Sequence, residues 1–176
     1  LFKYLHFYGS YDYVGDSSKW YKHEIRVIRN DRSIYSYKDA QGFRKGNNEK
    51  LSVYPVDACI YHYGWVKEPK AMQRKQENFN KFWHDDKWIE TNILKAAEFN
   101  YGLNVKQLSP FLGEHPEAMK KRIELKNWKF DHDLSINRKT LKDKFKVFLS
   151  ENFGIDLNYK NYTIAKLKNA SKPKSH

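Results

Sequence analysis

The segment 51-LSVYPVDACIYHYGW-65 decides how this sequence divides into strands and helices. Its apolar and aromatic run is interrupted at Pro55, which predicts one strand or two. The run ends on the tetrad His62 to Trp65, whose glycine would let a ligand approach the backbone closely at the mouth of the strand. From Pro69 onward the apolar residues follow helical spacing. The segment therefore marks the boundary between a β-rich first third and a helical remainder.

The residues before this boundary predict further strands and turns. An apolar, ring-rich run over residues 2–7 predicts a strand that leads into a loop. Residues 20–31 predict a second strand that closes on a turn at Asn30-Asp31. A short strand is predicted within residues 33–40, and residues 44–50 predict a polar hairpin loop.

The residues after the boundary predict helices. Pro69 suits the first turn of a helix, and Met72, Phe79 and Trp83 follow it at helical spacing. The segment 83-WHDDKW-88 predicts a helix boundary. Further helices are predicted over three stretches, which are residues 85–100, a segment beginning at Pro116, and residues 135–153.

These patterns together predict the organisation of the chain. We expect an α+β fold with a β-rich first third followed by a helical two-thirds. One domain is expected over residues 1–160, with strands and active-site loops over 1–66 and helices over 67–160. Lysines without acidic neighbours predict a basic tail over residues 161–176.

The composition limits the partners that the chain can have. Thirty-three Lys and Arg against 21 Asp and Glu give a net charge of +12, which attracts nucleic acid, anionic membranes or phosphorylated ligands. The 13 Tyr, 11 Phe and 5 Trp can fill a core, or can stack on sugars or bases in a cleft. The single cysteine, Cys59, excludes an internal disulfide and a cysteine-rich zinc site, and favours a reducing compartment.

Signals for membranes and export are missing from the sequence. It has no run of the ~20 apolar residues that a membrane span needs, and no signal-peptide pattern. Its first residue is Leu1 rather than Met. We therefore expect the chain to begin inside a longer natural polypeptide.

Two groups of polar residues are candidates for a functional site. The neutral imidazole of His62 could bind a divalent metal or a phosphate, could act as an acid or base, or could be an ordinary structural histidine. In 39-DAQGFR-44, the side chains of Asp39, Gln41 and Arg44 could surround hydroxyls or a phosphate. The same three residues could equally be surface residues of a turn, and both interpretations stay open.

Two other patterns carry less weight. Arg26 and Arg29 are three residues apart, so on a strand they point to opposite faces and only one could enter a given cleft. Asp131 and Asp133 match the Asp-x-Asp pattern by which nucleotide-sugar enzymes hold Mg²⁺ or Mn²⁺. Their position before a predicted helix favours a capping role instead, for Asp133 or Ser135.

Six segments resemble, in order and spacing, the C-terminal half of bacterial family-2 glycosyltransferases of a Bacteroidetes-type subgroup. The similarity runs through nearly the whole chain. The segments are "HFYGSYDYVG" (6–15), "KWYKHEIRVIRND" (19–31), "SYKDAQGFR" (36–44), "DACIYHYGWVKEPKAM" (57–72), "FWHDDKWI" (82–89) and "HPEAMKKRIELKNWKFD" (115–131).

The resemblance implies an enzyme that transfers a sugar from a nucleotide-sugar donor to an acceptor hydroxyl, with inversion, in cell-surface polysaccharide biosynthesis. It implies a Rossmann-like α/β glycosyltransferase fold, of which this chain would form the C-terminal part. In the family, the preceding half carries the nucleotide pocket, the Asp-x-Asp metal motif and the carboxylate base. We therefore expect this chain alone to be catalytically incomplete. The divalent metal cofactor, Mg or Mn, would be bound mainly by the preceding half.

The resemblance also assigns roles to the candidate residues. His62 would act at the phosphate or metal end of the site, as a catalytic residue and a metal ligand, and Asp39 would be a second catalytic residue. Tyr63 and Trp65 would stack on the substrate, and Gly64 would let it approach the backbone. The other substrate-binding residues would be polar side chains that line the site. The full set is Gln41, Arg44, Tyr63, Gly64, Trp65, Arg26 and Arg29.

Two other functions fit the composition, namely a basic nucleic-acid-binding module and a non-catalytic interaction domain. The charge forms no compact stripe outside the tail, so we expect no specific nucleic-acid partner. The expected partners are a nucleotide-sugar donor and a glycan or other hydroxyl acceptor. The expected location is cytoplasmic, with a peripheral position on the inner face of an anionic membrane as a further interpretation.

Overall fold

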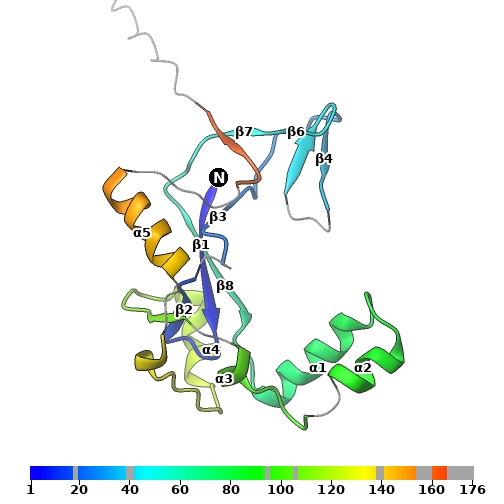
Figure 1. Ribbon diagram of the computed structural model, residues 1–176, viewed down its shortest axis with the longest axis vertical. Coiled ribbons are helices and arrows are strands. Elements are labelled where there is room, and N and C mark those ends of the chain that lie inside the picture. The colour runs from blue at the N-terminus through cyan, green and yellow to red at the C-terminus, as the bar shows by residue number, and fades with distance from the viewer. Residues whose placement is uncertain are drawn as a thin grey trace, which may run out of the picture. The chain divides into compact units, whose positions relative to one another are not determined.

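The computed structural model describes residues 1–17, 20–38, 42–93, 96–104, 107–137, 141–153 and 160–165 (Figure 1). The chain forms two compact units. Unit 1 comprises residues 1–4, 21–60 and 157–176, and unit 2 comprises residues 5–20 and 61–156. Strands β1 (Phe2–Tyr8) and β8 (Cys59–Trp65) contribute residues to both units. The prediction of one domain over residues 1–160 stays a prediction.

Unit 1 is built from short strands around a small apolar core. The first residues of β1 pair antiparallel with β3, β4 and β6 flank β5, and β7 runs parallel to β10. Its core contains Leu1, Ile25 and Leu51, each less than a tenth exposed. The strands are β3 (His23–Glu24), β4 (Ile34–Ser36), β5 (Phe43–Lys45), β6 (Glu49–Lys50), β7 (Ser52–Val53) and β10 (Thr163–Ile164).

The predicted hairpin loop over residues 44–50 is confirmed. It joins β5 to β6, and its backbone adopts positive φ at Gly46 (47°) and Asn48 (69°). Glycine and asparagine are the residues that adopt this left-handed conformation most readily, so the loop sequence matches the turn that it forms.

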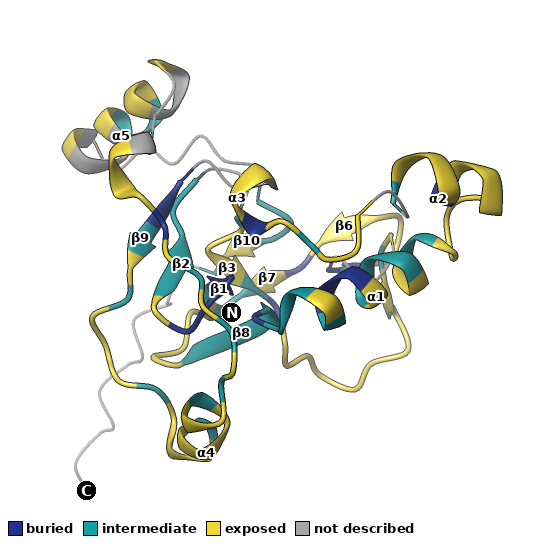
Figure 2. Cartoon of the chain, turned by 90° about the horizontal axis from the view of Figure 1, so that it is seen from below, coloured by how far each residue is buried: buried dark blue, intermediate teal, exposed yellow. Residues whose placement is uncertain are grey.

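Unit 2 combines an antiparallel sheet with short helices. Strand β8 pairs with β1, β1 with β2 (Tyr13–Gly15), and β2 with β9 (Leu108–Pro110). The pairs β1–β2 and β2–β9 are antiparallel. Its helical elements are α1 (Pro69–Asn80), α2 (Asp86–Asn92), α3 (Tyr101–Asn104), the 3-10 turn η1 (Glu117–Met119), α4 (Lys120–Glu124), the 3-10 turn η2 (Leu134–Ile136) and α5 (Leu141–Phe153). In Figures 1 and 2, α1 and α2 lie side by side.

Aromatic rings fill the core of unit 2. One cluster surrounds the buried residues Phe7, Tyr11 and Val66. A second contains Tyr8, Met72, Tyr101 and Leu108, and its members on α1, α3 and β9 are among the dark residues of these elements in Figure 2. Rings of this size bury large apolar areas, which explains how a chain with a mean hydropathy of -0.91 can form a core.

Several predicted boundaries are confirmed. Strand β1 covers the predicted run over residues 2–7, and Pro69 lies in the first turn of α1. Asp85 caps α2, because its carboxylate accepts a hydrogen bond of 2.8 Å from the backbone N–H of Trp88. Asp133 caps η2 through the N–H of Ser135, as the helix-start interpretation of Asp131-His132-Asp133 predicts.

The predicted β-rich first third and helical two-thirds are not observed. The described residues form 10 strands and 5 short helices, with 28% helix, and β9 and β10 lie beyond residue 100. The physical reason is visible at Phe99, Phe111 and Phe130, which contact the core clusters from segments without regular structure. A ring can fill core volume from an extended segment, so apolar residues there need no helical spacing.

The expected Rossmann-like sheet is also not observed. Among the described residues, the strand pairs whose register is determined are antiparallel, except that β7 and β10 are parallel. Rossmann-like sheets are mostly parallel.

Three predicted elements are shorter than expected. The strand over residues 20–31 is reduced to β3, because Ile25 is buried while Val27 is 73% exposed and has no core to face. The helix over residues 85–100 ends at Asn92. The last helix begins at Leu141 rather than near residue 135, and Gly154, its expected stop, lies outside the described residues.

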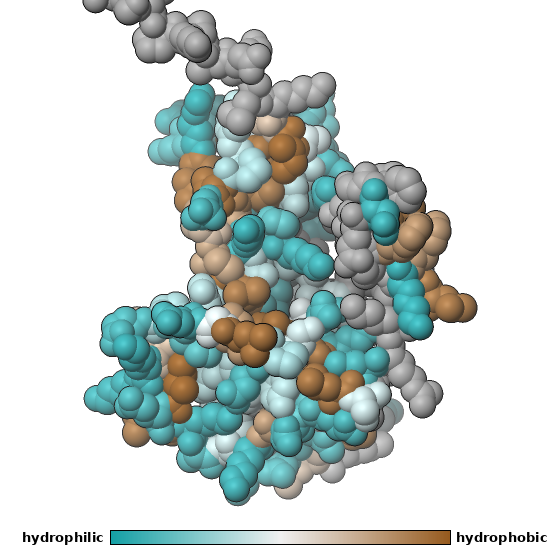
Figure 3. Space-filling view, turned by 90° about the vertical axis from the view of Figure 1, so that its left-hand side faces the viewer, coloured by the Kyte–Doolittle hydropathy of each residue, from teal (hydrophilic) through white to brown (hydrophobic). Residues whose placement is uncertain are grey.

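Hydrophobic side chains also reach the surface. Figure 3 shows them as separate patches among hydrophilic residues. Phe82 and Leu141 are 80% and 85% exposed. Within the described ranges, none of the helices combines the length and the apolar character needed to cross a lipid bilayer.

Candidate functional site

The site predicted at the tetrad centres on a pair of histidines. His62, on β8, lies beside His6 of β1, and their Nδ1 atoms are 3.2 Å apart. His6 is only 4% exposed, whereas His62 is partly exposed. At this distance one Nδ1 donates a hydrogen bond and the other accepts it. The tautomer of each imidazole is therefore set by the tautomer of the other. The pair is therefore a unit in which the exposed imidazole is oriented by a buried one.

Gly64 makes room for the His62 ring. The two residues are two apart on a strand and so face the same side. A Cβ at position 64 would lie 2.7 Å from both Cε1 and Nε2 of His62, which is closer than real contacts allow. The glycine of the tetrad is thus explained by the neighbouring imidazole, in addition to any ligand.

An indole lies against the buried histidine of the pair. The ring centroids of Trp20 and His6 are 5.1 Å apart, and Trp20 also packs against the core cluster around Tyr8. His6 and Trp20 were not among the residues predicted for the site. The signal available was the strand prediction over residues 2–7, which places His6 on a strand next to a buried core.

Tyr63 faces the opposite side of β8 and contributes to the core. Its ring stacks on Phe7 at 4.6 Å, and its hydroxyl lies 2.8 Å from Nδ1 of His115. Burial raises the pKa of Tyr63 to about 12. Phe7 therefore occupies one face of this ring and His115 engages its hydroxyl, which limits the stacking on a ligand that the resemblance suggests.

Trp65 ends β8 beside a lysine that sequence analysis missed. The Nζ of Lys75 donates a 2.7 Å hydrogen bond to the carbonyl of Gly64 and lies 5.3 Å from the Trp65 ring centroid. Burial, and secondarily the charge of Lys67, lowers the pKa of Lys75. Lys75 lies three residues after the buried Met72 on α1, so helical spacing could have placed it on the core side.

The predicted arginines lie in unit 1. Arg44 is 3% exposed, stacks over Tyr37 at 4.2 Å and donates to the carbonyls of Phe43 and Asn161. Its guanidinium therefore supports the fold of this unit.

Arg26 and Arg29 have different surroundings. Arg26 donates from Nε to the hydroxyl of Tyr4 at 2.8 Å and pairs with Glu24 at 3.6 Å. Arg29 is exposed. The other two predicted residues, Asp39 and Gln41, lie outside the described residues.

The surroundings of His62 do not match the ligand preference of Mg²⁺ or Mn²⁺. These ions prefer oxygen ligands, whereas His6 brings a second imidazole nitrogen. Over the part of the chain that the structure describes, no group of three or more His, Cys, Asp or Glu could hold a metal ion. The predicted binding of Mg or Mn, mainly by a preceding half of the protein, stays a prediction.

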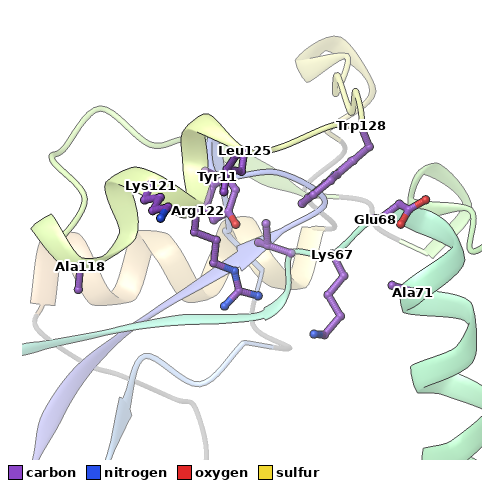
Figure 4. Close-up of a pocket in the computed structure, with 10 residues that line it drawn as sticks. Tyr11, Lys67, Glu68, Ala71, Ala118, Lys121, Arg122, Leu125 and Trp128 are labelled. Atoms are coloured by element: carbon purple, nitrogen blue, oxygen red, sulfur yellow. The ribbon is translucent and has the colours of Figure 1, made fainter.

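An open pocket follows directly after the tetrad in the chain. It has a volume of about 550 Å³ and is drawn in Figure 4. It was missed because its basic residues, two of them adjacent at 121–122, are unremarkable in a chain of such high positive charge. Its lining combines basic, apolar and aromatic residues: Tyr11, Val66, Lys67, Glu68, Ala71, Ala118, Lys121, Arg122, Leu125 and Trp128.

Comparisons with protein-family models, with curated proteins and with solved structures found no match to this chain.

Proposed function

We propose that this chain forms the C-terminal part of a family-2 glycosyltransferase, which transfers a sugar from a nucleotide-sugar donor to an acceptor hydroxyl with inversion. The observation that carries the proposal lies in segment 57–72, one of the six segments of the resemblance. Here the histidine of the tetrad is partly exposed and hydrogen-bonded to a buried histidine.

The chemistry of the pair suits the leaving-group end of such a reaction. If Nδ1–H of His6 donates to Nδ1 of His62, the proton of His62 is held on Nε2. An Nε2–H group can donate to a phosphate oxygen and stabilise the charge that develops as the diphosphate leaves. Gly64 keeps a side chain away from this same nitrogen. The base that takes the acceptor proton is assigned, by the resemblance, to the preceding half.

The proposal is tested in the natural protein that carries these residues. Release of nucleoside diphosphate from a panel of nucleotide sugars is measured with and without hydroxyl acceptors. His62→Ala is expected to lower kcat by roughly 100-fold or more, because a positioned proton donor contributes about that much, while the protein still folds and unfolds in one cooperative transition.

His84→Ala is the matched control. This exposed histidine stacks on Trp88 with ring centroids 3.6 Å apart and is expected to keep wild-type turnover. Normal turnover in His62→Ala would remove His62 from the mechanism. Failure to transfer any sugar from the panel would overturn the proposed function itself.

The proposal includes a location and partners. We infer that the enzyme works in the cytoplasm, on a glycan or other hydroxyl acceptor, at or near the inner face of the membrane. The net charge of +12 supports this, since basic proteins are attracted to anionic leaflets.

A further inference from the structure

We propose that the pocket between the turn after β8 and helix α4 binds the phosphate group of a phosphate-bearing small molecule. This inference goes beyond the transferase proposal and does not depend on it. It is carried by the charges, the rigidity and the size of the pocket.

Three cations line the pocket, and the described residues offer them no ion-pair partner. They are Lys67, Lys121 and Arg122, against one acid, Glu68. Figure 4 shows the Arg122 guanidinium and the Lys67 ammonium extending in the same direction, from α4 and from the turn after β8. The excess positive charge of the lining is therefore left for a ligand.

Two lysines near α4 that do not line the pocket do form ion pairs. On α4, Lys120 forms an ion pair with Glu117. After the helix, Lys126 pairs with Asp12 at 3.5 Å. Glu117 and Asp12 thus pair with lysines that do not line the pocket, whereas Lys121 and Arg122 both belong to its lining.

The positions of the lining residues are held by the core. The hydroxyl of Tyr101 donates to the carbonyl of Lys67 at 2.8 Å and accepts from its N–H at 3.3 Å, which anchors the backbone from which the ammonium extends. The indole of Trp128 donates to the carbonyl of Gly9 at 2.7 Å, and Tyr11 is 2% exposed. The backbone of Lys67 and the aromatic wall of the pocket are therefore already in place before a ligand arrives.

The chemistry favours phosphate over other anions. A guanidinium presents two parallel N–H groups to two oxygens, and an ammonium can bind a third, which matches the three terminal oxygens of a phosphate ester. The volume of about 550 Å³ lies within the range of small-molecule sites, and the small side chains of Ala71 and Ala118 leave room for the body of the ligand. A nucleic-acid strand would instead need an extended basic groove.

The test measures binding to the 176-residue chain at about 150 mM salt, by calorimetry and by tryptophan fluorescence. Inorganic pyrophosphate, a hexose 1-phosphate and a nucleoside monophosphate are the ligands. Saturable binding is expected, with a loss of about 10-fold or more in affinity for Arg122→Gln and for Lys67→Gln, because each removes a charge-assisted hydrogen bond. The ester that binds more tightly identifies the body of the ligand.

Lys120→Gln is the matched control, because it removes the same charge from the same helix outside the pocket. Wild-type affinity in Lys120→Gln supports the site. Equal losses in all three variants would show general attraction to a basic protein, and would overturn the proposal, as would the lack of saturable binding of all three ligands. Stronger binding of a single-stranded oligonucleotide, equally reduced in Lys120→Gln, would also overturn it. Circular dichroism checks that each variant folds. Because this experiment measures no sugar transfer, a negative binding result leaves the transferase proposal open to its own test.

Discussion

At the scale of single residues, the tetrad shows how one glycine can serve a neighbouring side chain. Gly64 has an extended backbone that other residues could adopt, so its identity is explained by space alone. The imidazole of His62 occupies the volume of the missing Cβ and thereby stays within hydrogen-bond distance of His6. The sequence pattern His-x-Gly therefore encodes the orientation of one ring.

This explanation predicts that Gly64→Ala destabilises the protein by roughly 1–3 kcal/mol, because the new Cβ forces the His62 ring to move in a packed region. The free energy of unfolding is measured in urea for Gly64→Ala, for His62→Ala and for the double variant. Once the ring is absent, the added methyl group has space, so the alanine at position 64 should cost much less in the double variant. Equal costs in both backgrounds would contradict the explanation.

At the scale of elements, local capping chemistry determines where short helices begin. Helix α2 has only seven residues and one buried side chain, Ile89, so it gains little from packing. Its first turn depends on the carboxylate of Asp85, which accepts the Trp88 N–H. Isolated helices of this length are marginal in water, and a lost cap is felt strongly there.

Asp85→Ala is accordingly expected to lower the free energy of unfolding by about 1 kcal/mol, within the range for capping aspartates. Amide hydrogen exchange should accelerate mainly in α2, with smaller changes in β1 and β8. Asp86→Ala is the matched control: it removes the same charge from the next residue but leaves the cap in place, so a smaller effect is expected. A larger loss for Asp86→Ala than for Asp85→Ala would show that charge near the helix start matters more than the cap.

At the scale of the whole molecule, the core of unit 2 places tyrosines where their neutral form is favoured. Burial raises the pKa of Tyr8, and it raises the pKa values of Tyr63 and Tyr101 to about 12. In an unfolded chain a tyrosine loses its proton near pH 10. The stabilisation from these residues is therefore complete below about pH 10, and it is lost as the pH rises from there toward their folded-state values.

The prediction is a fall in the free energy of unfolding between about pH 10 and pH 12, measured by urea titration at each pH. Absorbance of the phenolate should report the same residues, which ionise near pH 10 in the unfolded chain and at higher pH in the folded one. Tyr63→Phe removes one ionisable group and should make the fall less steep, although it also loses the hydrogen bond to His115. A constant stability across this range would contradict the burial of these rings.

Local signals in the sequence were sufficient for several features of the fold. The strand over residues 2–7, the hairpin at Gly46, the first turn at Pro69 and the cap at Asp133 all depend on a few adjacent residues, and the structure confirms them. Candidate site residues were harder to predict. The partner of His62 is 56 positions away in the chain, and Lys75 approaches Trp65 from a separate helix.

The amino-acid sequence by itself determined the strand that carries the tetrad, the positions of turns and caps, and the strong positive charge, because each depends on backbone preferences and side-chain chemistry of neighbouring residues. The tertiary structure alone decided the mainly antiparallel pairing, the place of extended segments in the core and the partners of His62. These features depend on which distant rings pack together. The spacing of apolar residues along the chain does not specify those contacts. For the same reason, only the folded chain brings Lys67 and Arg122 into one pocket.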